Sequence, residues 1–312
     1  MKKAAAIIIF FLLIAFLLPT AVHFIVTKND KRGSGKDASI SVYFKESGKI
    51  KNVSLEEYLV GVVGGEMPAE FESEALKAQA VAARSYILYK AEKQNADHPN
   101  AAVCTDSTHC KSYKDIETLK KLWGDKADKY EKKIKNAVNS TRGEVLTYDG
   151  NYCMTVFHSQ AGGGRTENSA DVWGGNVSYL VSVESHGEEK APNFNSTAEI
   201  PFSEFKEKIN EMGADVKTAS DIGESVRSDG GGVQTIIIGK KEFKGGEIRS
   251  AFSLRSTCFT INANDETVTF NVSGYGHGVG MSQYGANQMA KEGKGYKEIL
   301  SHYYTDTKLS YV

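Results

Sequence analysis

Proline, cysteine and net charge are all scarce in this chain of 312 residues, and each shortage excludes a class of protein. Five prolines beside 30 glycines argue against a disordered proline-rich chain and against a collagen-like repeat. Four cysteines are too few for a disulfide scaffold. The 38 basic and 39 acidic side chains give a formal charge of −1, whereas nucleic-acid-binding proteins usually carry a basic excess. We therefore expect a globular protein with no nucleic-acid partner.

The strongly apolar sequence is concentrated near the N-terminus, where residues 4–26 contain no acidic side chain, lysine or arginine. About 20 such residues span a bilayer core as a helix. A cleaved signal peptide is the alternative, but the stretch is long and lacks a clear cleavage site of small residues. We expect a transmembrane anchor at residues 1–26, a flexible tether at 27–38 and one ectodomain at 39–312.

The charges of the sequence say less about which side of the membrane follows this anchor. The cationic residues that follow the span do not favour an outward C-terminal side by charge alone. A single apolar segment ahead of a large domain is nevertheless typical of exported, anchored proteins. We therefore expect a single-pass protein of the cell membrane whose large domain is extracytoplasmic.

The ectodomain mixes helical and strand-like patterns without a regular alternation. Apolar residues recur every three or four positions across residues 73–94 and 116–137, which predicts two amphipathic helices, the second with a break at Gly124-Asp125. Short β-rich runs follow between residues 144 and 272, among them 152–157 and 179–183. Helical patterns return after residue 283. This mixture favours an α+β fold in one compact domain, which could carry an inserted lobe, over a doubly wound sheet.

Glu66 is the first candidate for chemistry. It follows Gly64-Gly65 and precedes Met67-Pro68, and a proline disfavours helix at the residue before it, so Glu66 lies near the end of an element. Apolar neighbours can raise the pKa of such a carboxyl and suit it to act as a general acid. The alternative is a solvated glutamate in a turn.

Lys77 and Arg84 lie seven residues apart in the first predicted helix and therefore share one face. They could orient a sugar hydroxyl or carboxylate, or keep Glu66 ionised. Gln79 lies between them among alanines that would let a ligand or another backbone come close. The alternative is a solvated helix face.

A cluster of two thiols and two imidazoles lies between the two predicted helices, at His98, Cys104, His109 and Cys110. This is the ligand set that tetrahedral zinc prefers, although the spacing is not that of a standard finger, and three of the four could suffice. A loop that joins two helices suits a structural metal rather than a catalytic one. The alternatives are a Cys104–Cys110 disulfide and unrelated surface residues.

Two glycine-rich segments carry further polar candidates. His158-Ser159 precedes Gly162-Gly163-Gly164, but adjacent residues do not form a hydrolase triad and no G-x-S-x-G motif is present. The second segment favours a carbohydrate site, because its rings and amide can stack on sugars and hydrogen-bond to them; a structural turn is the alternative. Its candidates are Tyr275, His277, Gln283 and Tyr284.

Four motifs in this order resemble the stage II sporulation protein D family. They extend from about residue 40 to the C-terminus, and the last motif is long and specific, although cell-wall amidase enhancers share the same core. The motifs are Glu66-Met67-Pro68, Lys77-Ala78-Gln79-Ala80 with Arg84 and Tyr86, His158-Ser159 with Gly162-Gly163, and Gly276-His277-Gly278-Val279-Gly280-Met281-Ser282-Gln283-Tyr284-Gly285-Ala286.

The resemblance implies a membrane-anchored lytic transglycosylase of endospore-forming bacteria. Such an enzyme cleaves the bond between N-acetylmuramic acid and N-acetylglucosamine without water and leaves a 1,6-anhydro end. The resemblance makes Glu66 both the acid and the base, which agrees with a lone glutamate rather than the carboxylate pair of ordinary glycosidases. Substrate contacts are then expected from the other motif residues: Lys77, Gln79, Arg84, His158, Ser159, Tyr275, His277, Gln283 and Tyr284.

The resemblance also implies partners. Family substrates are glycan strands stripped of stem peptides by the sporulation amidase P, and membrane protein M is the third member of a set that drives forespore engulfment from the mother-cell membrane. No cofactor is implied for catalysis, so the zinc prediction depends on ligand chemistry alone. Two other functions compete: a non-catalytic glycan-binding or amidase-enhancing module, and a zinc hydrolase that uses the His/Cys cluster.

Overall fold

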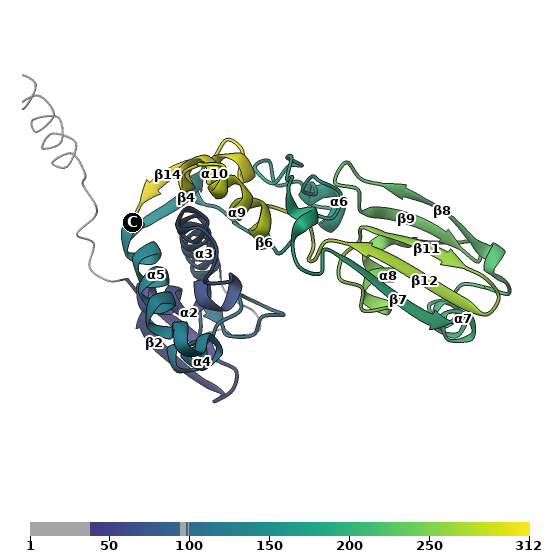
Figure 1. Ribbon diagram of the computed structural model, residues 1–312, viewed down its shortest axis with the longest axis horizontal. Coiled ribbons are helices and arrows are strands. Elements are labelled where there is room, and N and C mark those ends of the chain that lie inside the picture. Colours follow the sequence, from purple (N-terminus) through teal and green to yellow (C-terminus); the bar gives the residue numbers. More distant parts are fainter. Residues whose placement is uncertain (1–37, 94–97, 99) are drawn as a thin grey trace, which may run out of the picture. The chain divides into compact units, whose positions relative to one another are not determined.

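The computed structural model describes residues 38–93, 98 and 100–312. The anchor predicted at residues 1–26 lies outside the described residues, as does the tether up to residue 37. Within the described ranges, no helix combines the length and the apolar character that a membrane crossing requires. The predicted α+β mixture is confirmed (Figure 1).

The described chain alternates irregularly between helices and short strands. The helices are α2 (Leu55–Glu66), α3 (Ser73–Glu92), α4 (Ile116–Trp123), α5 (Ala127–Ser140), α6 (Ser169–Trp173), α7 (Phe202–Glu211), α8 (Gly245–Ala251), α9 (Gln283–Lys291) and α10 (Tyr296–Tyr303), with 3-10 turns at Gly124–Lys126, Glu188–Lys190 and Ala219–Asp221. The strands are β1 (Ser39–Phe44), β2 (Lys49–Ser54), β3 (Val103–Cys104), β4 (Glu144–Tyr148), β5 (Asn151–Tyr152), β6 (Phe157–His158), β7 (Asn195–Pro201), β8 (Ile222–Arg227), β9 (Val233–Ile238), β10 (Lys241–Lys244), β11 (Phe259–Ala263), β12 (Thr267–Ser273), β13 (Met281–Ser282) and β14 (Lys308–Tyr311).

A first hydrophobic core surrounds α3, which contacts α2, α5, α9 and α10 as well as strand β4 (Figure 1). Small side chains make this possible, because the alanines of α3 are almost all fully buried and let neighbouring helices approach closely. The C-terminal strand β14 pairs antiparallel with β4, so the end of the described chain is part of this core. The core residues come from both sides of a long intervening segment.

That segment forms a second hydrophobic core, drawn only from residues 202–272. It has two three-stranded antiparallel sheets, ordered β11-β12-β7 and β10-β9-β8, with α7 and α8 packed against them. Aromatic rings fill its centre: Phe205 stacks on Phe252 with 5.3 Å between ring centroids, and Phe252 lies 4.9 Å from Phe270. The second core is thus inserted into the sequence of the first.

A buried ion pair ties α2 and α3 together. Arg84 on α3 is fully buried, and its Nε and Nη2 atoms donate to the two carboxylate oxygens of Glu56 on α2, at 2.9 and 2.7 Å. The same guanidinium donates to the main-chain carbonyls of Val138 at the end of α5 and Glu144 at the start of β4. One side chain therefore fixes four elements of the first core.

The helical periodicity of the sequence predicted the long helices of the first core well. The helix expected at residues 73–94 is α3, and the one expected at 116–137 is α4 and α5, separated by the 3-10 turn at the expected break. Two expected strands are wrong. Only the ends of residues 152–157 are strand, and residues 179–183 form none, because their main chain bonds individually to residues 166–169 without a ladder.

The buried ion pair makes a first prediction. Replacement of Arg84 by Met leaves the Glu56 carboxylate buried and unpaired, so the free energy of unfolding should fall by about 3–5 kcal/mol. Denaturant unfolding measures the change. Lys77→Met on the same helix is the matched control, because it removes only the partly exposed pair with Glu74 and should cost less than about 1 kcal/mol. A loss of similar size in the two variants would contradict the role given to Arg84.

Candidate functional site

Three segments that are far apart in sequence meet at Glu66, the last residue of α2. Its Oε1 accepts a hydrogen bond of 2.6 Å from the main-chain N–H of Ser112. Its Oε2 lies 3.4 Å from Nε2 of Gln283, the first residue of α9. The carboxyl is therefore held between an amide of the loop after the Cys/His cluster and an amide side chain from the glycine-rich motif.

Close packing on α2 brings Ser112 to this position. A Cβ atom on Gly65 would lie 2.9 Å from the Ser112 carbonyl oxygen, and one on Gly61 would lie 2.4 Å from the Tyr113 ring. The glycines of this helix thus admit a neighbouring stretch of chain. Gly64 and Gly65 are both helical, and Gly64 packs against Leu119 of α4.

Parallel pairing positions the other side of the site. Strand β6 pairs with β13, with Phe157 opposite Met281 and His158 opposite Ser282, so the two glycine-rich motifs lie together. The Ser282 hydroxyl caps α9 by accepting from the Gly285 N–H, and it donates to the buried Glu188 carboxylate at 2.6 Å. This anchor fixes the first turn of α9, where Gln283 begins.

Burial raises the pKa of Glu66 above its ordinary value, and this desolvation outweighs the opposing effects. Those effects, which favour the ionised form, come from Lys111 and Lys114 and from the hydrogen bonds of Ser112 and Gln283. The principal groups that act on the carboxyl are thus amides and lysines. A glutamic acid that keeps its proton at higher pH than usual is suited to act as a general acid.

Lys111 is a neighbour of Glu66 that the sequence did not single out. Its side chain is buried, with the ammonium 3.8 Å from the ring centroid of Phe157 and 4.1 Å from that of Tyr86. Burial lowers its pKa to about 8, while Glu66 acts in the opposite direction. The only sequence signal was its place directly after Cys110, and a lone lysine after a cysteine does not predict burial.

Two buried polar atoms without partners belong to residues that contact Gln283 or pair with Ser282 beside it. Gln79 on α3 accepts from Gln283 through Oε1 at 3.4 Å, but its Nε2 has no hydrogen-bond partner. His158 donates through Nδ1 to the Val279 carbonyl, which leaves its Nε2 as an unpaired acceptor. Burial lowers the pKa of His158 to about 4, so the ring is neutral. Such atoms indicate a place where ligand or water completes the bonding.

Exposed aromatic rings lie on the glycine-rich segment that precedes Gln283 or next to it. The Trp173 ring, 45% exposed, lies 5.4 Å from that of His277, which in turn lies 5.7 Å from His158. Tyr275 is 46% exposed, and the Arg255 guanidinium stacks on its ring at 4.0 Å. Exposed rings of this kind stack on sugars. Trp173 and Arg255 were not predicted, because neither stands in a recognisable motif.

Not every expected substrate contact belongs to this group. The expectation for Arg84 is corrected, since its side chain is fully buried and bound to Glu56. Lys77 pairs with Glu74 at 2.6 Å and lies over the Tyr296 ring. Ser159 contributes its carbonyl, which accepts from the N–H of Tyr284. The Tyr284 ring packs edge-on against Phe71.

Three of the four predicted metal ligands come together in the structure, without Cys110. The ligand atoms of His98, Cys104 and His109 all lie within 4.8 Å of one another. His109 Nδ1 is 3.2 Å from Cys104 Sγ and 3.5 Å from Cys110 Sγ, and both thiols are free. The edge of a tetrahedral zinc site joining nitrogen and sulfur is about 3.6 Å, so this donor set fits such an ion.

The arrangement can perform acid–base chemistry with a single carboxyl. Oε1 of Glu66 accepts the short hydrogen bond of the Ser112 N–H, whereas Oε2 has only the long contact of 3.4 Å with Gln283, so Oε2 is the atom that can carry and transfer a proton. The unpaired polar atoms and the exposed rings offer contacts to a polar, ring-shaped ligand. Catalysis of this kind does not require the metal cluster as a reactant.

The family model and the two relatives below all carry the description stage II sporulation protein. The family model for SpoIID, described as stage II sporulation protein, matches residues 43–148. Stage II sporulation protein D of Bacillus amyloliquefaciens is 40% identical over 273 residues, which are 87% of this chain and 78% of that protein. Its counterpart in Bacillus subtilis strain 168 is 40% identical over 274 residues, covering 87% and 79%.

A relative of lower identity is named as an amidase enhancer. The amidase enhancer of Bacillus subtilis strain 168 is 27% identical over 307 residues, which cover 81% of this chain but only 40% of that protein. The shared part therefore forms less than half of the enhancer.

The contact between Lys111 and Glu66 makes a second prediction. Lys111→Met keeps the length of the side chain and removes its charge, so the pKa of Glu66 should rise further. A pH titration of the ¹³C-labelled carboxyl by NMR measures it. Lys132→Met, an exposed lysine of α5, is the control and should leave the titration unchanged. An equal or lower pKa in the Lys111 variant would show that its charge does not reach Glu66.

Proposed function

Because the chain belongs to the stage II sporulation protein D family, we propose that it is a lytic transglycosylase of the bacterial cell wall. Its substrate is the peptide-free glycan strand of peptidoglycan. It cleaves the bond between N-acetylmuramic acid and N-acetylglucosamine and leaves a 1,6-anhydro end. The relatives' names support a role in sporulation, where the enzyme degrades septal wall during engulfment of the forespore.

The observation that carries this proposal is the environment of Glu66. Its carboxyl has a raised pKa and is surrounded by amides and lysines, as a reaction with one acid–base group needs. Glycosidases that use water generally need a pair of carboxyls placed across the sugar. A transglycosylase needs only one, because a hydroxyl of the substrate replaces water.

The reaction balances with Glu66 alone. Protonated Oε2 gives its proton to the glycosidic oxygen as the bond from that oxygen to C1 of the muramic acid breaks. The resulting carboxylate then takes the proton of the C6 hydroxyl on the same sugar, and O6 forms the new bond to C1. Glu66 ends in its starting state. The Ser112 N–H stabilises the intermediate carboxylate through Oε1.

Sugar contacts come from the surrounding residues. The unpaired Nε2 of His158 can accept a hydroxyl proton, and the unpaired Nε2 of Gln79 can donate to an acetamido carbonyl. The rings of Trp173, His277 and Tyr275 offer faces on which pyranose rings pack. Burial lowers the pKa of His277, so it contributes a neutral ring.

The His/Cys cluster is proposed to hold a structural zinc ion. His98, Cys104 and His109, with Cys110 alongside, would be its ligands. The ion would order the loop that delivers Lys111 and the Ser112 N–H to Glu66. Thiolate and imidazole donors favour zinc over calcium or magnesium.

Location and partners follow from the proposed role. An anchor at residues 1–26 would hold the enzyme in the mother-cell membrane with its catalytic domain outside the cytoplasm. There it would act on strands prepared by the sporulation amidase P, together with membrane protein M. The relatedness to an amidase enhancer supports one alternative, a module that binds glycan and stimulates an amidase without cutting the strand.

Digestion of peptide-free glycan strands makes the third prediction. Wild type should yield 1,6-anhydromuramyl ends by mass spectrometry, and Glu66→Gln should lower the rate by at least about 10³-fold. The variant should also melt at an equal or higher temperature at neutral pH. The raised pKa of Glu66 means that ionisation costs folding free energy above that pKa, and Gln removes this cost.

The products also separate the competing functions. Reducing ends instead of anhydro ends would mean hydrolysis, and unchanged activity in Glu66→Gln would exclude this residue as the acid. Binding without any product, combined with faster release of stem peptides by an added amidase, would identify the enhancer module.

The metal makes the fourth prediction. Purified wild type should contain about one zinc per chain by elemental analysis. Cys104→Ser should lose the metal and melt several degrees lower, since metal binding and loop folding are coupled. Cys258→Ser is the control, because this thiol lies outside the cluster and should retain zinc. Wild type without stoichiometric metal would remove the zinc assignment.

A further inference from the structure

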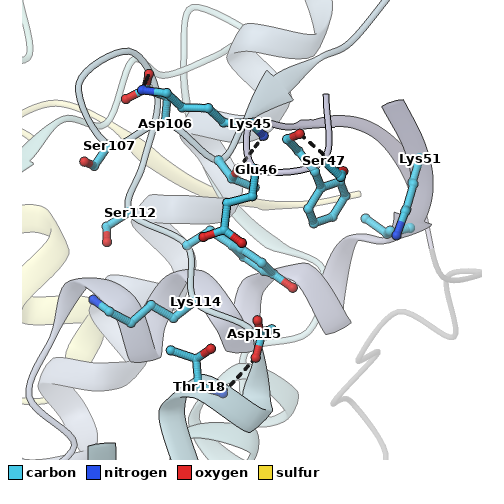
Figure 2. A pocket seen from close by; sticks show the side chains of 14 residues that line it. Lys45, Glu46, Ser47, Lys51, Asp106, Ser107, Ser112, Lys114, Asp115 and Thr118 are labelled. Atoms are coloured by element: carbon cyan, nitrogen blue, oxygen red, sulfur yellow. Dashed lines mark hydrogen bonds and ion pairs between the residues drawn. The ribbon is translucent and has the colours of Figure 1, made fainter. Parts of the chain in front are cut away.

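A cavity of about 730 Å³ lies beside Glu66, between the β1–β2 hairpin, residues 105–115 and the start of α4 (Figure 2). Its size falls within the roughly 300–1,000 Å³ typical of ligand sites. None of the substrate contacts predicted from the sequence lines it. The cavity therefore lies outside the set of substrate contacts described above.

One residue, Ser112, connects the cavity to the catalytic carboxyl. Ser112 lines the cavity, and its main-chain N–H donates to Glu66 at 2.6 Å. Lys114, two residues further on, also lines the cavity and is close enough to lower the pKa of Glu66. A strand whose scissile bond lies at Glu66 would thus reach this cavity with a neighbouring sugar.

An aromatic side chain provides a firm wall. The Tyr113 ring stacks on the buried Tyr58 ring with 4.9 Å between centroids and an interplanar angle of 13°. It meets Phe44 edge-on at 5.7 Å, and its other neighbour is Gly61 of α2. The ring is held on several sides and still lines the cavity, so it can pack against a pyranose without reordering.

The charges of the cavity are mostly paired. Lys45 forms an ion pair of 2.6 Å with Asp106, and Asp115 caps α4 by accepting from the Thr118 N–H. Lys51 lies over the Phe44 ring.

Lys114 differs from these groups, since it has no ion pair or hydrogen bond from its ammonium to any residue that the structure describes. Figure 2 shows it on the same side of the cavity as Ser107 and Ser112, whereas Lys51 lies on the other side. Glu46, an exposed residue of the hairpin turn, is the remaining acidic group. An unpaired ammonium and a fixed ring that line the same cavity are the combination that an acidic sugar needs.

We propose that this cavity is a second glycan subsite, in which Tyr113 packs on an N-acetylmuramic acid unit and the Lys114 ammonium pairs with its free lactyl carboxylate. The inference rests on the proposed function and extends it. A lactyl group that still carries a stem peptide has no carboxylate at this position. The subsite would therefore make peptide removal a condition for productive binding.

Kinetics on two matched substrates test the subsite. The substrates are peptide-free strands and the same strands with their lactyl carboxyls reduced to alcohols. On the first, Lys114→Ala should raise KM about tenfold relative to wild type, because a charge-assisted contact is lost. On the reduced strands, the variant and wild type should have equal KM. Lys114→Arg, which keeps the charge, should restore most of the affinity.

Controls separate this inference from the proposed reaction. Lys132→Ala removes a charge on α5 outside the cavity and should leave both substrates unaffected. Binding of the strands by Glu66→Gln, with and without Lys114→Ala, is measured in parallel. Cleavage with no difference between the two substrates would overturn the subsite and leave the reaction intact. Binding that depends on Lys114 and the carboxyl, without any cleavage by wild type, would overturn the reaction and support the subsite.

Discussion

The buried Arg84 guanidinium is the contact on which the arrangement around Glu66 depends. It joins the start of α2, the middle of α3, the end of α5 and the start of β4 within hydrogen-bond distance. Glu66 stands at the opposite end of α2, so the position of the carboxyl follows from the position of this helix. An ion pair removed from water is costly unless every donor is satisfied, and here four hydrogen bonds compensate for the desolvation. The residue that was expected to meet substrate instead holds the scaffold.

Much of the fold could be predicted because its helices bury one regular stripe. The apolar period of α3 and the break between α4 and α5 were readable for this reason. Strand β7 was not predicted, because its sequence NSTAEIP is mostly polar and only part of it is covered. Glu66 could be singled out in the sequence from its place before Met67-Pro68. Lys111 and Trp173 could not be predicted, because their importance comes from neighbours in the folded chain. Lys111 lies against the rings of Phe157 and Tyr86, and Trp173 lies beside His277.

The loop after the Cys/His cluster connects two sites that are separate in the sequence, namely the cluster itself and the surroundings of Glu66. Its cysteines and histidines meet at one point, and the very next residues supply a cation and an N–H to Glu66. The residues after those line the neighbouring cavity. A loop with few apolar side chains cannot hold such positions by hydrophobic packing alone. Close approach to the glycines of α2 and the clustered ligand atoms supply the order that packing does not.

The insertion of the second core into the first has a consequence for the order in which the chain matures. Residues 202–272 contain all the buried side chains of the second core, so this part can collapse as soon as it has been synthesised. The first core still lacks α9, α10 and β14 at that moment. Gln283, which faces the carboxyl from α9, arrives only with this last portion. A nascent chain that has not yet reached α9 therefore has Glu66 with the Ser112 contact but without Gln283, so the surroundings of the carboxyl are completed only after the second core has been synthesised.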